Sequence, residues 1–149
     1  MQFDGNNSRG VFMRNEIVIK KMTSLKHCLD RLEEKRPDKW ETLLKSYDLQ
    51  DIISINLERA VQLTVDIGLH SLSELRVQPP ETMDEVFSLL HRKGVITETL
   101  AQHLISAVGF RNIAVHEYEE IDWKIVHSIL FHHLADFHQF MRRILEFEV

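Results

Sequence analysis

Cysteine, proline and glycine are all scarce in this chain of 149 residues. A single cysteine, Cys28, excludes a disulfide within the chain and a zinc site built from cysteines, and it fits a reducing compartment. With only three prolines and five glycines, few positions interrupt a helix. The composition therefore favours long helices around an apolar core in a single domain.

The chain also lacks long apolar runs and a surplus of positive charge. No stretch has the length and apolarity needed to span a bilayer, and the N-terminus has no basic-then-apolar secretory layout. We therefore expect a cytoplasmic protein with no membrane partner. The formal net charge is −5. Because general binding to a nucleic-acid backbone requires a basic surface that displaces counterions, any RNA would have to bind at a local cluster of positive groups.

The apolar residues that are present recur at helical spacing, and no segment alternates as a strand would. Helical segments are expected at about 15–35, 39–47, 49–75, 83–93, 98–115 and 123–145. Segment 1–14 is polar and has no periodicity. We therefore divide the chain into a mobile N-terminal arm, residues 1–14, and one all-α bundle domain, residues 15–149.

Capping signals mark where several of these helices begin. Asp38, Thr97 and Asp122 each precede a helical segment and can accept hydrogen bonds from its first amide groups. Thr82 and Glu85 stand at the reciprocal spacing of a capping box. These signals predict four defined helix starts.

One short segment combines side chains that can act on a phosphodiester. Residues 109–118 read Gly-Phe-Arg-Asn-Ile-Ala-Val-His-Glu-Tyr, so Arg111, Asn112, His116 and Tyr118 follow one another at the end of an apolar helical run. An arginine can hold a phosphate with two parallel hydrogen bonds, and a histidine can transfer protons near neutral pH. This segment is the candidate functional site.

Helix geometry limits how these side chains can meet. Asn112 and His116 are four residues apart and share a face. Arg111 and His116 are five apart, which places them about 140° from each other around an ideal helix. Either the helix ends near Val115, or a second subunit completes the site. The structural alternative is that Arg111 pairs with an acidic residue such as Asp66 and His116 merely ends a helix.

The segment resembles the R-N-x-x-x-H-x-Y signature of the HEPN superfamily, in its HepT-like branch, with Arg111, Asn112, His116 and Tyr118 in the four fixed places. The resemblance continues outside the motif. Residues 60–70 resemble the second core helix of that family, residues 87–112 resemble the segment leading into the motif, and residues from Ile121 onwards resemble its last helix. It covers roughly residues 15–145 and leaves the N-terminal arm unmatched.

The resemblance implies an all-α, up-down bundle of four to five helices that dimerises, so that two copies of the motif face one cleft. It also implies metal-independent endoribonuclease activity without a cofactor. Arg111 would hold the scissile phosphate, His116 would exchange a proton with the 2′-hydroxyl or the leaving oxygen, and Asn112 would orient the substrate or His116. Such a cut leaves a 2′,3′-cyclic phosphate and a 5′-hydroxyl.

A protein partner is implied as well. HepT-like proteins are commonly toxins whose antitoxin is a small nucleotidyltransferase of the MNT type, which transfers AMP to the motif tyrosine, here Tyr118. A bulky anion two residues from His116 would block and repel an RNA backbone. Without the motif, the favoured interpretation of Tyr118 would be an interfacial residue whose hydroxyl group is hydrogen-bonded. The competing function is a non-catalytic helical module that binds a nucleotide or a partner protein.

Two further groups of polar residues are weaker candidates. Glu58, Gln62 and Asp66 lie four apart on one helix face, as a possible supporting polar seam opposite the motif or as a plain solvated face. The last helix carries several histidines, but none has the spacing of a metalloprotease H-E-x-x-H, so we expect solvated or interfacial histidines and no metal. They are His127, His132, His133 and His138.

Overall fold

The structure is a computed structural model that describes residues 5–148, with side chains from residue 16 to residue 147. Within this range it consists of helices and contains no strand, which confirms the all-α prediction. None of the described helices is both long enough and apolar enough to cross a membrane. The helices are α1 (Gly5–Lys35), α2 (Glu41–Lys45), α3 (Tyr47–Glu74), α4 (Met83–Arg92), α5 (Glu98–His116), the 3-10 turn η1 (Tyr118–Glu120), α6 (Trp123–His132) and α7 (Leu134–Glu148).

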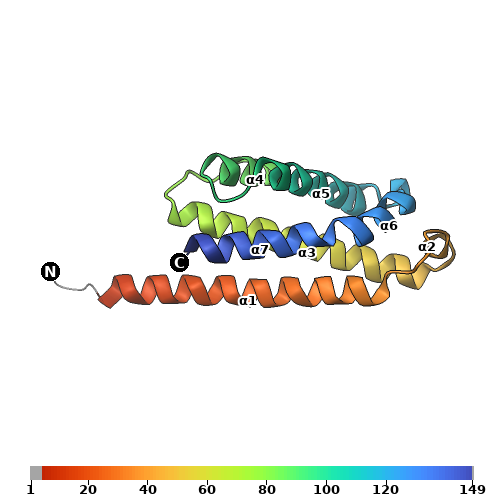
Figure 1. The fold of residues 1–149 in the computed structure, drawn as a ribbon, viewed down its shortest axis with the longest axis horizontal. Helices are drawn as coiled ribbons and strands as arrows, with labels where there is room; N and C mark the ends of the chain where they lie inside the picture. The colour runs from red at the N-terminus through yellow and green to blue at the C-terminus, as the bar shows by residue number, and fades with distance from the viewer. Residues whose placement is uncertain (1–4, 149) are drawn as a thin grey trace.

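The long helices form an up-down bundle (Figure 1). Helix α1 runs along one side, α3 returns beside it, α5 runs in the direction of α1, and α6 with α7 returns across α3. The short α2 turns the chain at one end of the bundle, and α4 packs on α3 and α5. This arrangement confirms the up-down bundle of four to five helices. The motif at the end of α5 therefore lies near the end of the bundle that α2 and α6 close.

The core is apolar, and α4 approaches α3 closely within it. Phe87 of α4 and Phe140 of α7 are fully buried and meet edge to face, with 6.0 Å between ring centroids. Gly68 of α3 lies under this contact, and a Cβ atom there would be 2.6 Å from Cγ1 of Val86 and 3.1 Å from Cδ1 of Leu90. Such contacts are too short, so this crossing requires a glycine.

Because of this close approach, we expect Gly68→Ala to lower the free energy of unfolding by about 1–3 kcal/mol, as overpacked cores do. The matched control is Gly109→Ala, also within a helix, where a Cβ atom meets nothing within 4 Å. Alanine there should be neutral or stabilising, since it has the higher helix propensity. Urea denaturation of both variants measures the difference, and equal stabilities would contradict the packing argument.

Two of the predicted caps are confirmed. The Thr97 hydroxyl accepts a hydrogen bond from the Leu100 amide at 3.2 Å and begins α5. The Asp122 carboxylate accepts from the amides of Lys124 at 3.0 Å and Ile125 at 3.4 Å and begins α6. The start of α5, which carries the motif, and the start of α6, which follows it, therefore lie where the sequence predicts.

The other two caps are wrong in detail. Helix α2 begins after Trp40 without a side-chain cap, so Asp38 does not start it. Thr82 does precede α4, but its side chain makes no capping bond. Glu85 Oε2 instead accepts from the amide of Glu81 at 3.3 Å, one residue before the expected partner. At these exposed ends, a neighbouring amide or solvent can replace the predicted bond at little cost.

The first helix starts earlier than predicted, since α1 begins at Gly5 and not near Asn15. Residues 1–4 lie outside the described residues. No proline precedes Pro37, so nothing in the sequence forces a break between Gly5 and Lys35. The division into an arm, 1–14, and a domain, 15–149, stays a prediction.

The last helix, predicted as continuous from Asp122, is instead broken at His133, where α6 ends and α7 follows. At the break the Leu130 carbonyl accepts a hydrogen bond from Nη1 of Arg36 at 2.9 Å. The Arg36 guanidinium also lies over the Phe131 ring, 4.6 Å from its centroid. A side chain that takes up a helix carbonyl is a recognised cause of a sharp bend.

Candidate functional site

The motif occupies the last turns of α5 and the short turn that follows. One side of α5 packs into the bundle through its buried residues, which are Leu100, Ala101, Leu104, Val108 and Ala114. The helix continues through His116, and the Glu117 amide closes it on the Ile113 carbonyl at 2.8 Å. Arg111, Asn112 and His116 therefore stand on one continuous helix. The prediction that it ends near Val115 is off by a single residue.

Arg111 is half-buried, and no acidic side chain among the described residues neutralises its charge. Within that part of the chain, its side chain makes one hydrogen bond, from Nη1 to Oδ1 of Asn112 at 3.4 Å, and no ion pair. Asp66 is engaged elsewhere, by Lys21 Nζ at 3.5 Å and Gln62 Nε2 at 3.0 Å. The structural alternative for Arg111 is thus wrong, and its guanidinium is available to an anion.

His116 is exposed at the C-terminal end of α5, and its side chain makes no hydrogen bond or ion pair to any other described residue. Because the helix is continuous, the separation of about 140° between Arg111 and His116 holds. One chain therefore brings Arg111 to Asn112 but does not bring His116 to Arg111. Within a single chain the guanidinium of Arg111 and the imidazole of His116 thus point to different sides of α5.

Tyr118 turns back onto α3. Its hydroxyl donates a hydrogen bond to Oδ1 of Asp51 at 3.2 Å, and its ring packs edge to face on Trp123, with 6.2 Å between centroids. Partial burial raises the pKa of the Tyr118 phenol, a hydrogen bond with Ser54 lowers it, and the carboxylates of Asp51 and Glu58 raise it further. The phenol is therefore protonated at neutral pH, and 39% of the residue stays exposed.

Our sequence analysis missed Asp51 and Ser54. With Glu58 they follow the i, i+3, i+7 spacing of one helix face, which was the available signal. The predicted seam has two separate sets of partners. The Glu58 carboxylate raises the pKa of Tyr118, whereas Gln62 donates a hydrogen bond to Asp66, which also pairs with Lys21 of α1. The supporting role of the seam stays a prediction.

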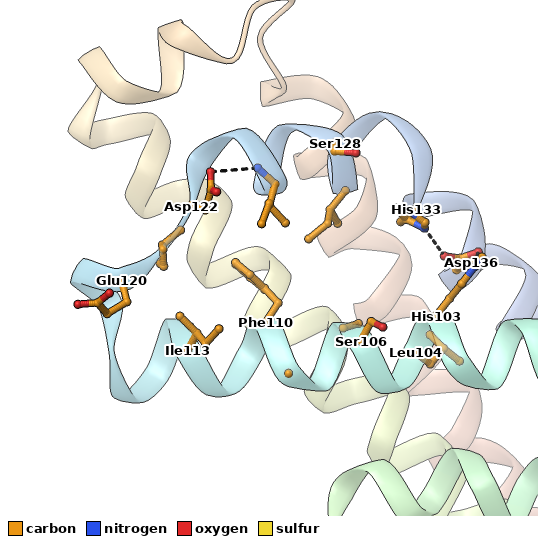
Figure 2. Close-up of a pocket in the computed structure, with 15 residues that line it drawn as sticks. His103, Leu104, Ser106, Phe110, Ile113, Glu120, Asp122, Ser128, His133 and Asp136 are labelled. Carbon is orange, nitrogen blue, oxygen red and sulfur yellow. Dashed lines mark hydrogen bonds and ion pairs between the residues drawn. The ribbon is translucent and has the colours of Figure 1, made fainter.

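A pocket of about 650 Å³ opens between α5 and α6–α7, beside the motif. Figure 2 shows Phe110 and Ile113 pointing from α5 towards α6, with Glu120 beside Ile113 and Asp122 across the pocket at the start of α6. At its other end the pocket reaches a group of two histidines and a carboxylate. Its walls are mainly apolar, so the pocket is better suited to contacts with apolar groups than to binding a charged substrate.

An all-helical bundle that carries R-N-x-x-x-H-x-Y at the end of α5 is a protein of the HEPN class. Comparison with known families then gives the branch. A family model described as Ribonuclease HepT-like matches residues 25–144. This chain belongs to the HepT-like ribonuclease family.

Two relatives cover most of the chain. The mRNA nuclease HepT of Shewanella oneidensis is 35% identical over 127 residues, which are 85% of this chain and 95% of that protein. The tRNA nuclease HepT of Aphanizomenon flos-aquae is 28% identical over 128 residues, 86% of this chain and 87% of that protein. The two relatives differ in the RNA that they are named for, so family membership alone does not select a substrate.

Solved structures agree with this placement. A tri-AMPylated HEPN toxin of Shewanella oneidensis in complex with an MNT antitoxin matches with a TM-score of 0.82 and 34% identity, over 87% of this chain and 97% of that chain. A toxin–antitoxin structure with AMP-PNP matches with a TM-score of 0.82 and 33% identity, over 88% and 98%. The cytosolic protein YutE of Bacillus subtilis, at 16% identity and a TM-score of 0.77, shares the fold.

Proposed function

We propose that this protein is a cytoplasmic endoribonuclease toxin that cuts RNA without a metal ion or other cofactor, at a site made by Arg111, Asn112 and His116. The observation that carries the proposal is the half-buried Arg111, which has no acidic partner among the described residues and stands beside Asn112. Support comes from the two relatives named as nucleases of mRNA and tRNA. A charge held so close to the core without a counter-ion is suited to a phosphate.

The three side chains can share one reaction. The 2′-oxygen attacks phosphorus, the bond to the 5′-oxygen breaks, and Arg111 stabilises the negative charge that grows on the phosphoryl oxygens. His116 takes the 2′-hydroxyl proton or supplies one to the leaving 5′-oxygen. Since Oδ1 of Asn112 accepts from Arg111, its Nδ2 group remains to donate to the substrate. The products are a 2′,3′-cyclic phosphate and a 5′-hydroxyl.

In this proposal the site is closed by a second copy of the chain. Arg111 of one copy would face His116 of the other, because the two diverge on one helix. Apolar residues stand exposed between them, with Ile113 40% and Val115 44% accessible, and they can be buried in the dimer. Two motifs at one cleft would also gather positive charge on a protein whose net charge is −5.

The test is cleavage of total cellular RNA by purified protein in EDTA, followed by mapping of the new ends. We expect cuts that leave a cyclic phosphate, because only the 2′-hydroxyl route gives that end. Loss of cleavage in EDTA with recovery on adding Mg²⁺, an oxygen-ligand ion that does not replace a zinc-type ion at histidines, would contradict the metal-free mechanism. Binding of RNA or nucleotide without any cut would favour the non-catalytic module.

The partner in this proposal is an MNT-type nucleotidyltransferase antitoxin that transfers AMP to Tyr118, as in a type VII-like toxin–antitoxin pair. It is supported by the related toxin that carries AMP groups in complex with an MNT antitoxin. The Tyr118 oxygen would attack the α-phosphorus of ATP, the bond to pyrophosphate would break, and Asp51 would accept the phenol proton. The hydrogen bond of 3.2 Å places that carboxylate in reach.

We therefore expect Asp51→Asn to slow AMP transfer by about 100-fold at neutral pH, since the amide keeps the shape but cannot take a proton. Because the pKa of Tyr118 is raised, the phenol does not ionise by itself at that pH, and the defect should shrink as the pH rises towards that pKa. AMP incorporation from labelled ATP over a pH series measures this. Asp48→Asn, in the first turn of α3, is the control, and a defect independent of pH would contradict the base role.

A further inference from the structure

Three possible metal ligands from two helices converge at the end of the α5–α7 pocket. Nδ1 of His103 lies 3.2 Å from Oδ1 of Asp136, and Nδ1 of His133 lies 2.9 Å from Oδ2 of the same carboxylate. All the donor atoms lie within 4.8 Å of one another. The imidazoles meet edge to face, with 5.1 Å between centroids, and the Nδ1 atom of each faces Asp136 (Figure 2).

The carboxylate at the centre of this group lacks a permanent counter-charge. The side chain of Asp136 is only 15% exposed. Its side-chain partners among the described residues are the two imidazoles, and histidine, unlike lysine or arginine, carries no permanent positive charge. A largely buried carboxylate is stabilised by a cation. A metal ion would supply that charge.

The spacing of the donors fits a small divalent ion. Zinc binds histidine nitrogen and carboxylate oxygen at about 2.0–2.2 Å in a tetrahedron, which puts neighbouring donor atoms about 3.3 Å apart. The separations of 3.2 Å to Oδ1 and 2.9 Å to Oδ2 of Asp136 are close to that value, and the remaining donor pair lies within 4.8 Å. The imidazoles are each about 40% exposed, at 40% and 42%, so water can complete the coordination from the pocket.

The break between α6 and α7 is part of this arrangement. His133 stands at the break and Asp136 lies in the first turn of α7, and both contact His103 of α5. His103 on α5 is eight residues before Arg111, about 12 Å along the helix axis. An ion there would join α5 to α7 without entering the phosphate site.

We propose that His103, His133 and Asp136 form a binding site for a divalent transition-metal ion of the zinc type, with water as the fourth ligand. Each imidazole would bind the ion through Nδ1 and carry a proton on Nε2. The Nδ1 proton that faces Asp136 in the metal-free protein would leave that nitrogen, for Nε2 or for solvent, when the ion binds. The ion fixes the helix that carries the motif to the last helix of the bundle. This inference does not depend on the proposed ribonuclease activity.

The test is titration of the untagged, metal-free, full-length protein with Zn²⁺ by calorimetry and with Co²⁺ by visible spectroscopy. We expect one ion per chain and the intense d–d absorption of tetrahedral cobalt. His103→Gln, His133→Gln and Asp136→Asn should each weaken Zn²⁺ binding at least about 100-fold, since changes merely around a metal site already cost 10–100-fold. His132→Gln, an exposed histidine beside the group, is the matched control and should bind as the wild type does.

Circular dichroism and metal-free melting of each variant separate loss of ligand from loss of fold. Asp136→Asn keeps the size of the side chain and serves where a histidine variant fails to fold. The site is refuted if the folded wild type takes up no ion, or if Asp136→Asn binds Zn²⁺ as tightly as wild type. Neither outcome affects the ribonuclease proposal, because RNA cleavage is not the quantity measured.

Discussion

Replacement of His116 by alanine is expected to reduce RNA cleavage by about 10²–10⁴-fold, the usual contribution of a general acid or base. The melting temperature should stay close to that of the wild type, because His116 is exposed at a helix end and has no partner among the described residues. Initial rates of cleavage of a labelled RNA, with thermal melting of the same samples, measure both quantities. A large fall in melting temperature would instead make His116 a structural residue.

Arg111→Ala should cost a comparable factor through loss of charge stabilisation in the transition state. Arg111→Lys is the informative second variant, because it keeps the charge but loses the planar pair of donors. His132→Ala removes an exposed histidine from α6 and should leave cleavage unchanged. Cleavage by His116→Ala at the wild-type rate would remove the acid–base role.

Mixing the two inactive variants tests whether the site spans two copies. If Arg111 of one copy works with His116 of the other, a dimer of one Arg111→Ala chain and one His116→Ala chain keeps one intact site. When equal amounts of the two variants exchange subunits at random, half of the dimers are mixed. Each mixed dimer has one intact site out of two, so about a quarter of the wild-type activity should return. No recovery in mixed dimers would contradict a site shared in this way.

The bundle was predictable because apolar spacing records burial directly. Helix limits followed from local signals, such as Thr97 and Asp122, whose capping bonds depend on residues two or three positions away. The break at His133 was not predictable, since it accompanies a bond from Arg36, 94 residues before the Leu130 carbonyl that accepts it. Contacts that distant leave no local pattern in one sequence.

In the candidate site, too, the features set by neighbouring residues were predictable and those set by distant contacts were not. Arg111, Asn112, His116 and Tyr118 were identified because the motif is contiguous, and their spacing already indicated that one helix does not close the site. The bond from Tyr118 to Asp51 joins residues 67 apart and needed the fold. From the sequence, His133 was considered only with the other histidines of the last helix, and it was not connected with Asp136 or with His103, which comes from another helix.

Neutralisation of the toxin by the antitoxin should depend on the hydroxyl oxygen of Tyr118. We expect Tyr118→Phe to keep cleavage of RNA and to abolish both AMP incorporation and neutralisation by the antitoxin. Phenylalanine retains the ring that packs on Trp123 and removes the hydroxyl that bonds to Asp51. The loss of one exposed hydrogen bond costs about 1 kcal/mol at most, so the fold persists. Labelled ATP, purified antitoxin and growth of cells expressing both proteins give the readouts.

The chain offers a matched control, because it has only two tyrosines. Tyr47, 81% exposed at the start of α3, is the more accessible of the two. Accessibility alone would therefore direct AMP to Tyr47, whereas proximity to His116 and the Asp51 carboxylate would direct it to Tyr118. Tyr47→Phe should be modified and silenced like the wild type. Full neutralisation of Tyr118→Phe with no AMP attached would show that the antitoxin acts by covering the site, and the covalent model would fail.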